Sequence, residues 1–253
     1  MKNASNIFTA IFFLALILFY GCSKSQTASP TKIPLGGRII SFAGYDWIVR
    51  STGKATQGPG PNYFSDEKQN AWVDEKGRLH LRITKKEGIW YAAEVTLRKV
   101  FGYAKYAFEV ESPMGKFDKN VVAAFFIYKS DIEEADIEFS TWGKPEDNNA
   151  QFVVQPGDRS GNKERFEWMD AQGNTSTHII DWQEKYTTFA SYQGEMKDTA
   201  TNTSTRTMWQ YAGTDNPRDQ DARLKINLWL FKGQPPSDGK EVEMIVSDFK
   251  IID

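Results

Sequence analysis

Polar and apolar residues alternate along most of this chain, and that alternation limits its fold more than any other feature. A period of two sends successive side chains to opposite faces of a β-strand. Strands are predicted over residues 79–83, 105–110, 121–128, 224–229 and 242–246, of which 121–128 is a continuous apolar run. Turn-forming clusters separate these runs, and neither a long helical stripe nor an internal repeat is visible. The pattern predicts an all-β sandwich or barrel.

The composition limits the chemistry that is open to the chain. One Cys and two His among 253 residues exclude thiolate zinc sites, clusters of several His and a disulfide framework. Because 31 Lys and Arg face 33 Asp and Glu, there is no basic excess to bind a nucleic-acid backbone. A His-dependent nucleophile would have to rely on His80 or His178 alone. Carboxylates are therefore expected to carry any catalysis.

The N-terminus is typical of an export signal. A positive start is followed by the apolar residues 7–19, which are too few for a secure membrane span. The segment then ends in Gly21-Cys22 and resembles the lipobox of bacterial lipoproteins, in which the Cys is lipidated. An ordinary signal peptide with a chance Cys is the alternative. We expect a signal peptide over 1–21, a lipidated Cys22 with a flexible tether over 22–37, and one folded domain over 38–253.

The most informative segment is Glu133–Phe139, in which acids and apolar residues alternate. On a strand, Glu134, Asp136 and Glu138 share one face while the apolar residues between them point into the core. Neighbouring like charges raise at least one carboxyl pKa, and carboxyls whose pKa values differ can serve as acid and base. The spacing alone also allows a solvated polar face or a Ca²⁺ site built from three oxygens.

The same segment resembles the Glu-x-Asp-x-Glu signature of glycoside hydrolase family 16. Further similarities follow in the family's order at residues 102–109, 124–128, 177–182 and 226–229, so the resemblance extends from about Tyr45 to the C-terminus. It implies a concanavalin-like β-jelly-roll sandwich of two curved antiparallel sheets. It also implies an enzyme that cleaves β-linkages in polysaccharides.

By this resemblance, Glu134 is the nucleophile, Glu138 is the general acid/base, and Asp136 supports the nucleophile. A retaining glycosidase needs one carboxylate that attacks the anomeric carbon and one carboxyl that protonates the leaving oxygen. Their Cα atoms would lie about 13 Å apart on a flat strand, whereas retaining enzymes hold the two carboxyl groups about 5–5.5 Å apart. The strand is therefore expected to curve.

Substrate-binding residues are predicted from the same resemblance, because a sugar cleft needs aromatic platforms and polar groups that reach hydroxyls. They are Asn62, Glu94, Tyr128, Trp142, Gln151 and Trp229. His178 is expected to make a structural hydrogen bond, and His80 is expected to lie on the strand face opposite the core with no assigned function. The polar run 198–204 is expected to be a solvated hairpin tip.

The sequence thus predicts a monomeric, lipid-anchored and exported retaining endo-hydrolase, facing the periplasm or lying on the cell surface. The five-residue signature favours β-glucan as substrate. No cofactor or metal is required, and a structural Ca²⁺ is not predicted. Three alternatives remain at this point: a non-catalytic carbohydrate-binding lipoprotein on the same fold, a transglycosylase, and a structural surface lipoprotein.

Overall fold

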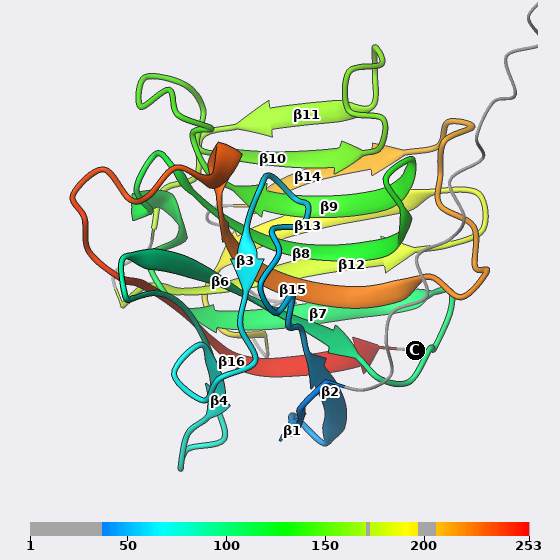
Figure 1. Cartoon of the computed structure of the whole chain (residues 1–253). Coiled ribbons are helices and arrows are strands. Elements are labelled where there is room, and N and C mark those ends of the chain that lie inside the picture. The colour runs from blue at the N-terminus through cyan, green and yellow to red at the C-terminus, as the bar shows by residue number, and fades with distance from the viewer. Residues whose placement is uncertain (1–36, 171–172, 197–205, 253) are drawn as a thin grey trace, which may run out of the picture. The chain divides into compact units, whose positions relative to one another are not determined.

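A computed structural model describes residues 37–170, 173–196 and 206–252, which form two β-sheets packed face to face (Figure 1). The front sheet follows the pairing order β11-β10-β9-β8-β15-β6-β2-β1. Its strands are β11 (Lys163–Phe166), β10 (Ala150–Val154), β9 (Glu133–Phe139), β8 (Val121–Ser130), β15 (Arg223–Leu230), β6 (Ile89–Leu97), β2 (Tyr45–Val49) and β1 (Ile39–Phe42). The short β3 (Tyr63–Phe64) pairs in parallel with β6.

The back sheet follows the order β4-β5-β16-β7-β12-β13-β14. Its strands are β4 (Ala71–Val73), β5 (Leu79–Lys86), β16 (Val242–Ile252), β7 (Ala104–Glu111), β12 (Thr175–Trp182), β13 (Thr187–Gln193) and β14 (Arg206–Tyr211). The β5–β6 hairpin joins the two sheets, because the first part of β5 pairs with β16 and its end pairs with β6. All five predicted strands are present, and the predicted all-β jelly-roll fold is confirmed.

Helical structure is nearly absent from the described part of the chain. Two short 3₁₀ turns lie wholly within it, Met114–Lys116 and Phe231–Gly233. Among those same residues, no helix has the length and apolar character needed to cross a membrane. Cys22, its tether and the polar run 198–204 lie outside the described residues.

Aromatic side chains from the inner faces of the two sheets meet in the core. Phe125 of β8 packs on Phe108 of β7 with ring centroids 4.7 Å apart, and Phe152 of β10 stacks on Phe189 of β13 at 5.5 Å. All four are fully buried, and burying each such side chain contributes roughly 1.5–3 kcal/mol. This packing holds the two sheets together.

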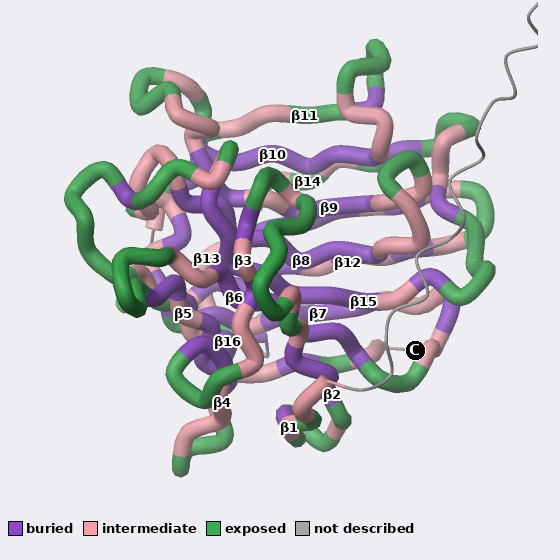
Figure 2. The backbone as a smooth tube through the Cα atoms, viewed as in Figure 1, coloured by how far each residue is buried: buried purple, intermediate pink, exposed green. Residues whose placement is uncertain are grey.

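The strand β9 lies inside the front sheet between β8 and β10 (Figure 1). It is therefore an interior strand of that sheet. Ala135, Ile137 and Phe139 are completely buried in the core. The alternating acids therefore point away from the core, onto the outer face of the front sheet. In Figure 2, most of the length of β8, β9, β10 and β15 is coloured as buried.

Candidate functional site

The three acids of β9 lie on the outer face of the front sheet, two strands from its β11 edge. In the register of the sheet, Glu138 lies opposite Gln151 of β10, and Glu134 lies opposite Tyr128 of β8. Asp136 is buried at 3% exposure, and the two glutamates are half-buried. The predicted triplet is thus an outward-facing row of carboxyls set into the sheet rather than a fully solvated surface.

Burial is the main cause that raises the pKa of all three carboxyls. It raises the pKa of Glu134 to about 8, where a hydrogen bond with Asp136 opposes the shift and the charge of Glu138 adds to it. The pKa of Asp136 lies well above its usual value because of burial and the charges of both glutamates. A proton on Asp136 can be donated to Glu134, which favours the ionised form of Glu134.

Glu138 has a different surrounding from Glu134. Gln151 donates from Nε2 to Glu138 Oε2 at 2.5 Å. Burial raises the pKa of Glu138, while this hydrogen bond and the charges of Lys163 and Arg165 on β11 oppose the rise. Gln151, predicted to contact substrate, therefore contacts the predicted acid/base directly and fixes its carboxyl in place.

An ion cluster that the sequence reasoning missed lies on the same face, on β15 and β6, the second and third strands from β9. Glu94 is almost fully buried, and its carboxylate accepts from Lys225 Nζ at 3.1 Å and from Arg50 Nη1 at 3.0 Å. Asn227 Nδ2 donates to the same carboxylate at 3.4 Å. The two cations offset the burial penalty and hold the pKa of Glu94 below its usual value. Glu94, predicted to bind a sugar hydroxyl, is thus the centre of this cluster.

Lys225 links the ion cluster to the row of carboxyls. Its ammonium lies 4.4 Å from the ring centroid of Tyr128, the residue that pairs with Glu134. Its positive charge lowers the pKa of Glu134, against the effect of burial. The sequence could have indicated Lys225, because residues 225, 227 and 229 share one face of a strand and Trp229 was already predicted to bind substrate.

Tyr128 and the two predicted tryptophans make contacts of their own in the structure. The Tyr128 hydroxyl donates to Asp131 at 2.8 Å. Trp229 lies on the same face and packs in a small apolar cluster with Phe64, Ala92, Val122 and Phe231. Trp142 follows the end of β9, and the Arg165 guanidinium lies 4.4 Å above its ring. Contact of these rings with a sugar stays a prediction.

Asn62 has a structural role in the structure. Its amide nitrogen donates to Pro59 O at 2.8 Å and Leu230 O at 2.9 Å, and its oxygen accepts from Leu230 N at 3.1 Å. Both amide hydrogens are therefore used in fastening the Gly-Pro loop to the end of β15. At 3% exposure the side chain presents little surface to a ligand.

The two histidines lie where they were expected. His178 is fully buried and hydrogen-bonds with Ser176 and Ser191 at 3.0 and 2.9 Å, while burial lowers its pKa to about 3. His80 is on the face of β5 opposite the core residues, yet Trp72 covers it to 7% exposure. Neither histidine lies in the row of carboxyls.

Metal ligation receives no support from the described residues, which contain no group of three or more His, Cys, Asp or Glu able to hold an ion. Glu134, Asp136 and Glu138 instead interact with one another, with Gln151 and with Gln155, whose Nε2 lies 3.4 Å from Asp136. The prediction that no metal or cofactor is required stays a prediction.

Replacing Asp136 by Asn is expected to stabilise the fold, and more at high pH than at low pH. Because its pKa is raised, Asp136 keeps its proton in the folded chain above about pH 4, where the unfolded chain releases it. The wild type therefore loses stability as the pH rises above about 4. Asn does not titrate, and its amide can still donate to Glu134. We expect Tm to rise by at least about 2 °C at pH 8, with little change at pH 4. A gain that is the same at both pH values would contradict the raised pKa.

A family model and several solved structures resemble this chain. The family model described as glycosyl hydrolases family 16 matches residues 60–244. No curated protein matches the chain. Solved structures do match: a β-1,3-glucanase from Mycobacterium marinum is 18% identical with a TM-score of 0.58, covering 81% of this chain and 90% of that one.

Two further solved structures have the same fold. A Bacillus licheniformis β-glucanase is 17% identical with a TM-score of 0.58, covering 87% of this chain and 99% of that one. A prokaryotic β-1,3-1,4-glucanase (lichenase) from a mouse hindgut metagenome is 20% identical with a TM-score of 0.58, covering 84% and 96%. At these identities, the likeness shows the fold.

Proposed function

The chain belongs to the glycosyl hydrolases of family 16 and is a glycosidase, and from that premise we propose that it cleaves internal β-linkages of a polysaccharide with retention. The observation that carries the proposal is the row of three carboxyls on the outer face of β9, where burial raises the pKa of each. Glu134 is proposed as the nucleophile, Glu138 as the acid/base and Asp136 as the positioning residue.

The reaction proceeds in two displacements. Glu134 attacks the anomeric carbon as the glycosidic C–O bond breaks, and Glu138 gives its proton to the leaving oxygen. Glu138, now ionised, takes a proton from water, which attacks the glycosyl ester and releases Glu134. Two inversions give net retention. The hydrogen bond with Asp136 and the charge of Lys225 support the ionised state of Glu134 that the first step needs.

A β-glucan is the proposed substrate class. The five-residue signature favours it, and the three similar structures are named as a β-1,3-glucanase, a β-glucanase and a lichenase. Transglycosylation is the second candidate, because a sugar hydroxyl can replace water on the same intermediate. A binding module without activity is disfavoured, since three carboxyls with raised pKa values are a stability cost that binding alone does not require.

A panel of polysaccharides tests the proposal. We expect the purified domain to shorten mixed-linkage β-glucan rapidly to mid-sized products, with the β-anomer seen first by NMR, and to do so equally in the presence of a chelator. Products longer than the starting oligosaccharide would instead support transglycosylation. A first-formed α-anomer would contradict retention, and metal-reversible loss of activity would contradict the cofactor-free mechanism.

We also propose that the enzyme is exported as a monomer and held to a membrane through lipid on Cys22. The Gly21-Cys22 junction supports this, together with the absence of any other Cys in the sequence. Cys22→Ser is expected to move the protein from the membrane to the soluble fraction or to block its processing, whereas Ser23→Ala leaves it in the membrane. A Cys22→Ser protein that fractionates and is processed like the wild type would contradict the anchor.

A further inference from the structure

The back sheet carries an aromatic platform that catalysis does not use. Trp72 of β4 lies opposite His80 of β5 in the register, and the two rings stack with centroids 4.6 Å apart at an angle of 15°. The neighbours of His80 on its strand, Leu79 and Leu81, are fully buried in the core. Trp72 and His80 therefore lie on the outer face of the back sheet, on the opposite side of the sandwich from Glu134.

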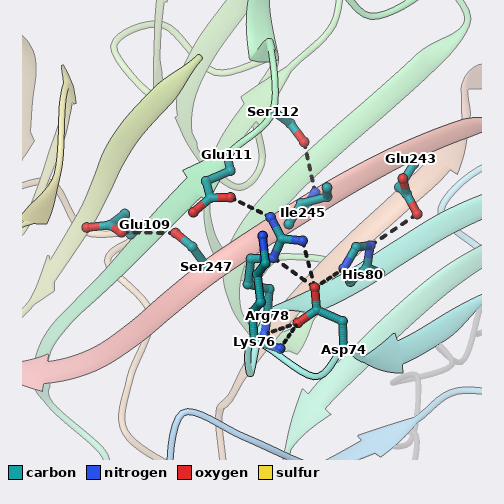
Figure 3. Close-up of polar contacts among 10 residues, drawn as sticks. All are labelled: Asp74, Lys76, Arg78, His80, Glu109, Glu111, Ser112, Glu243, Ile245 and Ser247. Carbon is teal, nitrogen blue, oxygen red and sulfur yellow. Dashed lines mark hydrogen bonds and ion pairs between the residues drawn. The ribbon is translucent and has the colours of Figure 1, made fainter. Parts of the chain in front are cut away.

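The imidazole beneath Trp72 is held rigidly. His80 Nδ1 lies 3.1 Å from Glu243 and Nε2 lies 3.1 Å from Asp74, as Figure 3 shows. Asp74 in turn accepts from the backbone of Arg78 at 2.9 Å and from its Nε at 2.8 Å. Because Trp72 stacks on this fixed imidazole, its indole loses little conformational freedom when a ligand covers it.

A hollow with a volume of about 680 Å³ adjoins Trp72. Its wall combines apolar surface from Ile40 and Val73 with the polar groups of Lys68, Gln69 and Arg82, of which Gln69 Nε2 already donates to Glu67 at 3.0 Å. Its lining contains no carboxylate, and the Glu241 that pairs with Arg82 lies outside it. A half-buried indole flanked by hydrogen-bond donors suits the apolar face and hydroxyl oxygens of a sugar ring.

We infer that this hollow is a second binding site for the polysaccharide substrate, with Trp72 as its stacking platform. β4 is five strands from β9 in the pairing order, which is about 24 Å along the curved sheet at 4.8 Å per strand. A short oligosaccharide in the cleft does not reach it. A polymer engaged at both sites is retained by its raised effective concentration. The inference rests on the proposed function only for the identity of the polymer.

The test compares Trp72→Ala with Trp72→Phe, and with Ile89→Ala as an exposed apolar control elsewhere. Trp72→Ala is expected to raise the half-saturating concentration of mixed-linkage β-glucan about fivefold or more. Turnover of a short β-gluco-oligosaccharide should stay unchanged. Trp72→Phe and Ile89→Ala should both behave as the wild type. Equal losses on polymer and oligosaccharide, or none on either, would overturn the inference.

A binding measurement separates this inference from the proposed function. In native gels that contain β-glucan, migration of the Glu134→Gln protein is expected to be slowed, and adding Trp72→Ala should weaken that retardation. Because this needs no turnover, a result here stands even if the wild type cleaves no glucan. Retardation that is identical with and without Trp72 would overturn the second site. So would Trp72-dependent binding to vesicles of anionic lipid without any effect on glucan.

Discussion

Glu134→Ala is expected to lose activity by about 10⁴-fold or more, because the proposed nucleophile is then missing. The side chain is half-buried at the outer face of the sheet, so its removal leaves a small cavity and an intact fold. Azide is small enough to enter that cavity. Attacking an activated β-glycoside from the vacated side, it is expected to give an α-glycosyl azide at a rate that rises with azide concentration, as measured by NMR of the product.

Glu133→Ala is the matched control for this variant. Glu133 begins the same strand, but Arg218 and Lys129 pair with its carboxylate at 2.7 and 2.9 Å, and these ion pairs hold its pKa below the usual value. It is therefore a structural acid, and its loss should leave turnover within about tenfold of the wild type. A Glu134→Ala enzyme that retains activity, or yields a β-glycosyl azide, would show that another residue is the nucleophile.

The alternation along β9 was enough to predict which side chains face out and which enter the core. Residues two apart must share a strand face, and the burial of Ala135 and Ile137 confirms this expectation. The same rule placed His80 away from the core. It could not show that Trp72 covers the imidazole, because that depends on the pairing of β4 with β5.

The ion cluster shows why part of the site escaped prediction. Lys225 and Glu94 are 131 residues apart in the sequence, and they meet because β15 pairs with β6. Asn62 likewise meets the backbone of Leu230 across 168 residues. Residue type marked Asn62 as a group suited to sugars, but only the tertiary contact shows that its amide is already occupied. Contacts between residues this far apart in the sequence depend on the strand order of the whole sheet rather than on the local sequence pattern.

Glu138→Gln is expected to separate proton donation from nucleophilic attack. Burial raises the pKa of Glu138 and thereby keeps a proton available for the leaving oxygen. Gln cannot donate that proton, so turnover of polysaccharide should fall by about 10²–10⁴-fold. The acidic phenol of an activated aryl glycoside leaves without being protonated. The rate of the first displacement on this substrate should therefore be nearly unchanged, and it should appear as a burst of released phenol. Equal losses on both substrates would contradict Glu138 as the acid.

Azide again distinguishes the two glutamates. In Glu138→Ala, Glu134 still forms the glycosyl ester, and azide then takes the place of water in the second displacement. Two inversions are expected to give a β-glycosyl azide, the opposite anomer to that from Glu134→Ala. Gln151 donates a hydrogen bond to Glu138, and this bond lowers the pKa of that carboxyl. Gln151→Ala should therefore move the basic limb of the pH–rate profile to higher pH without abolishing turnover. The same anomer from both glutamate variants would refute the assignment of roles along β9.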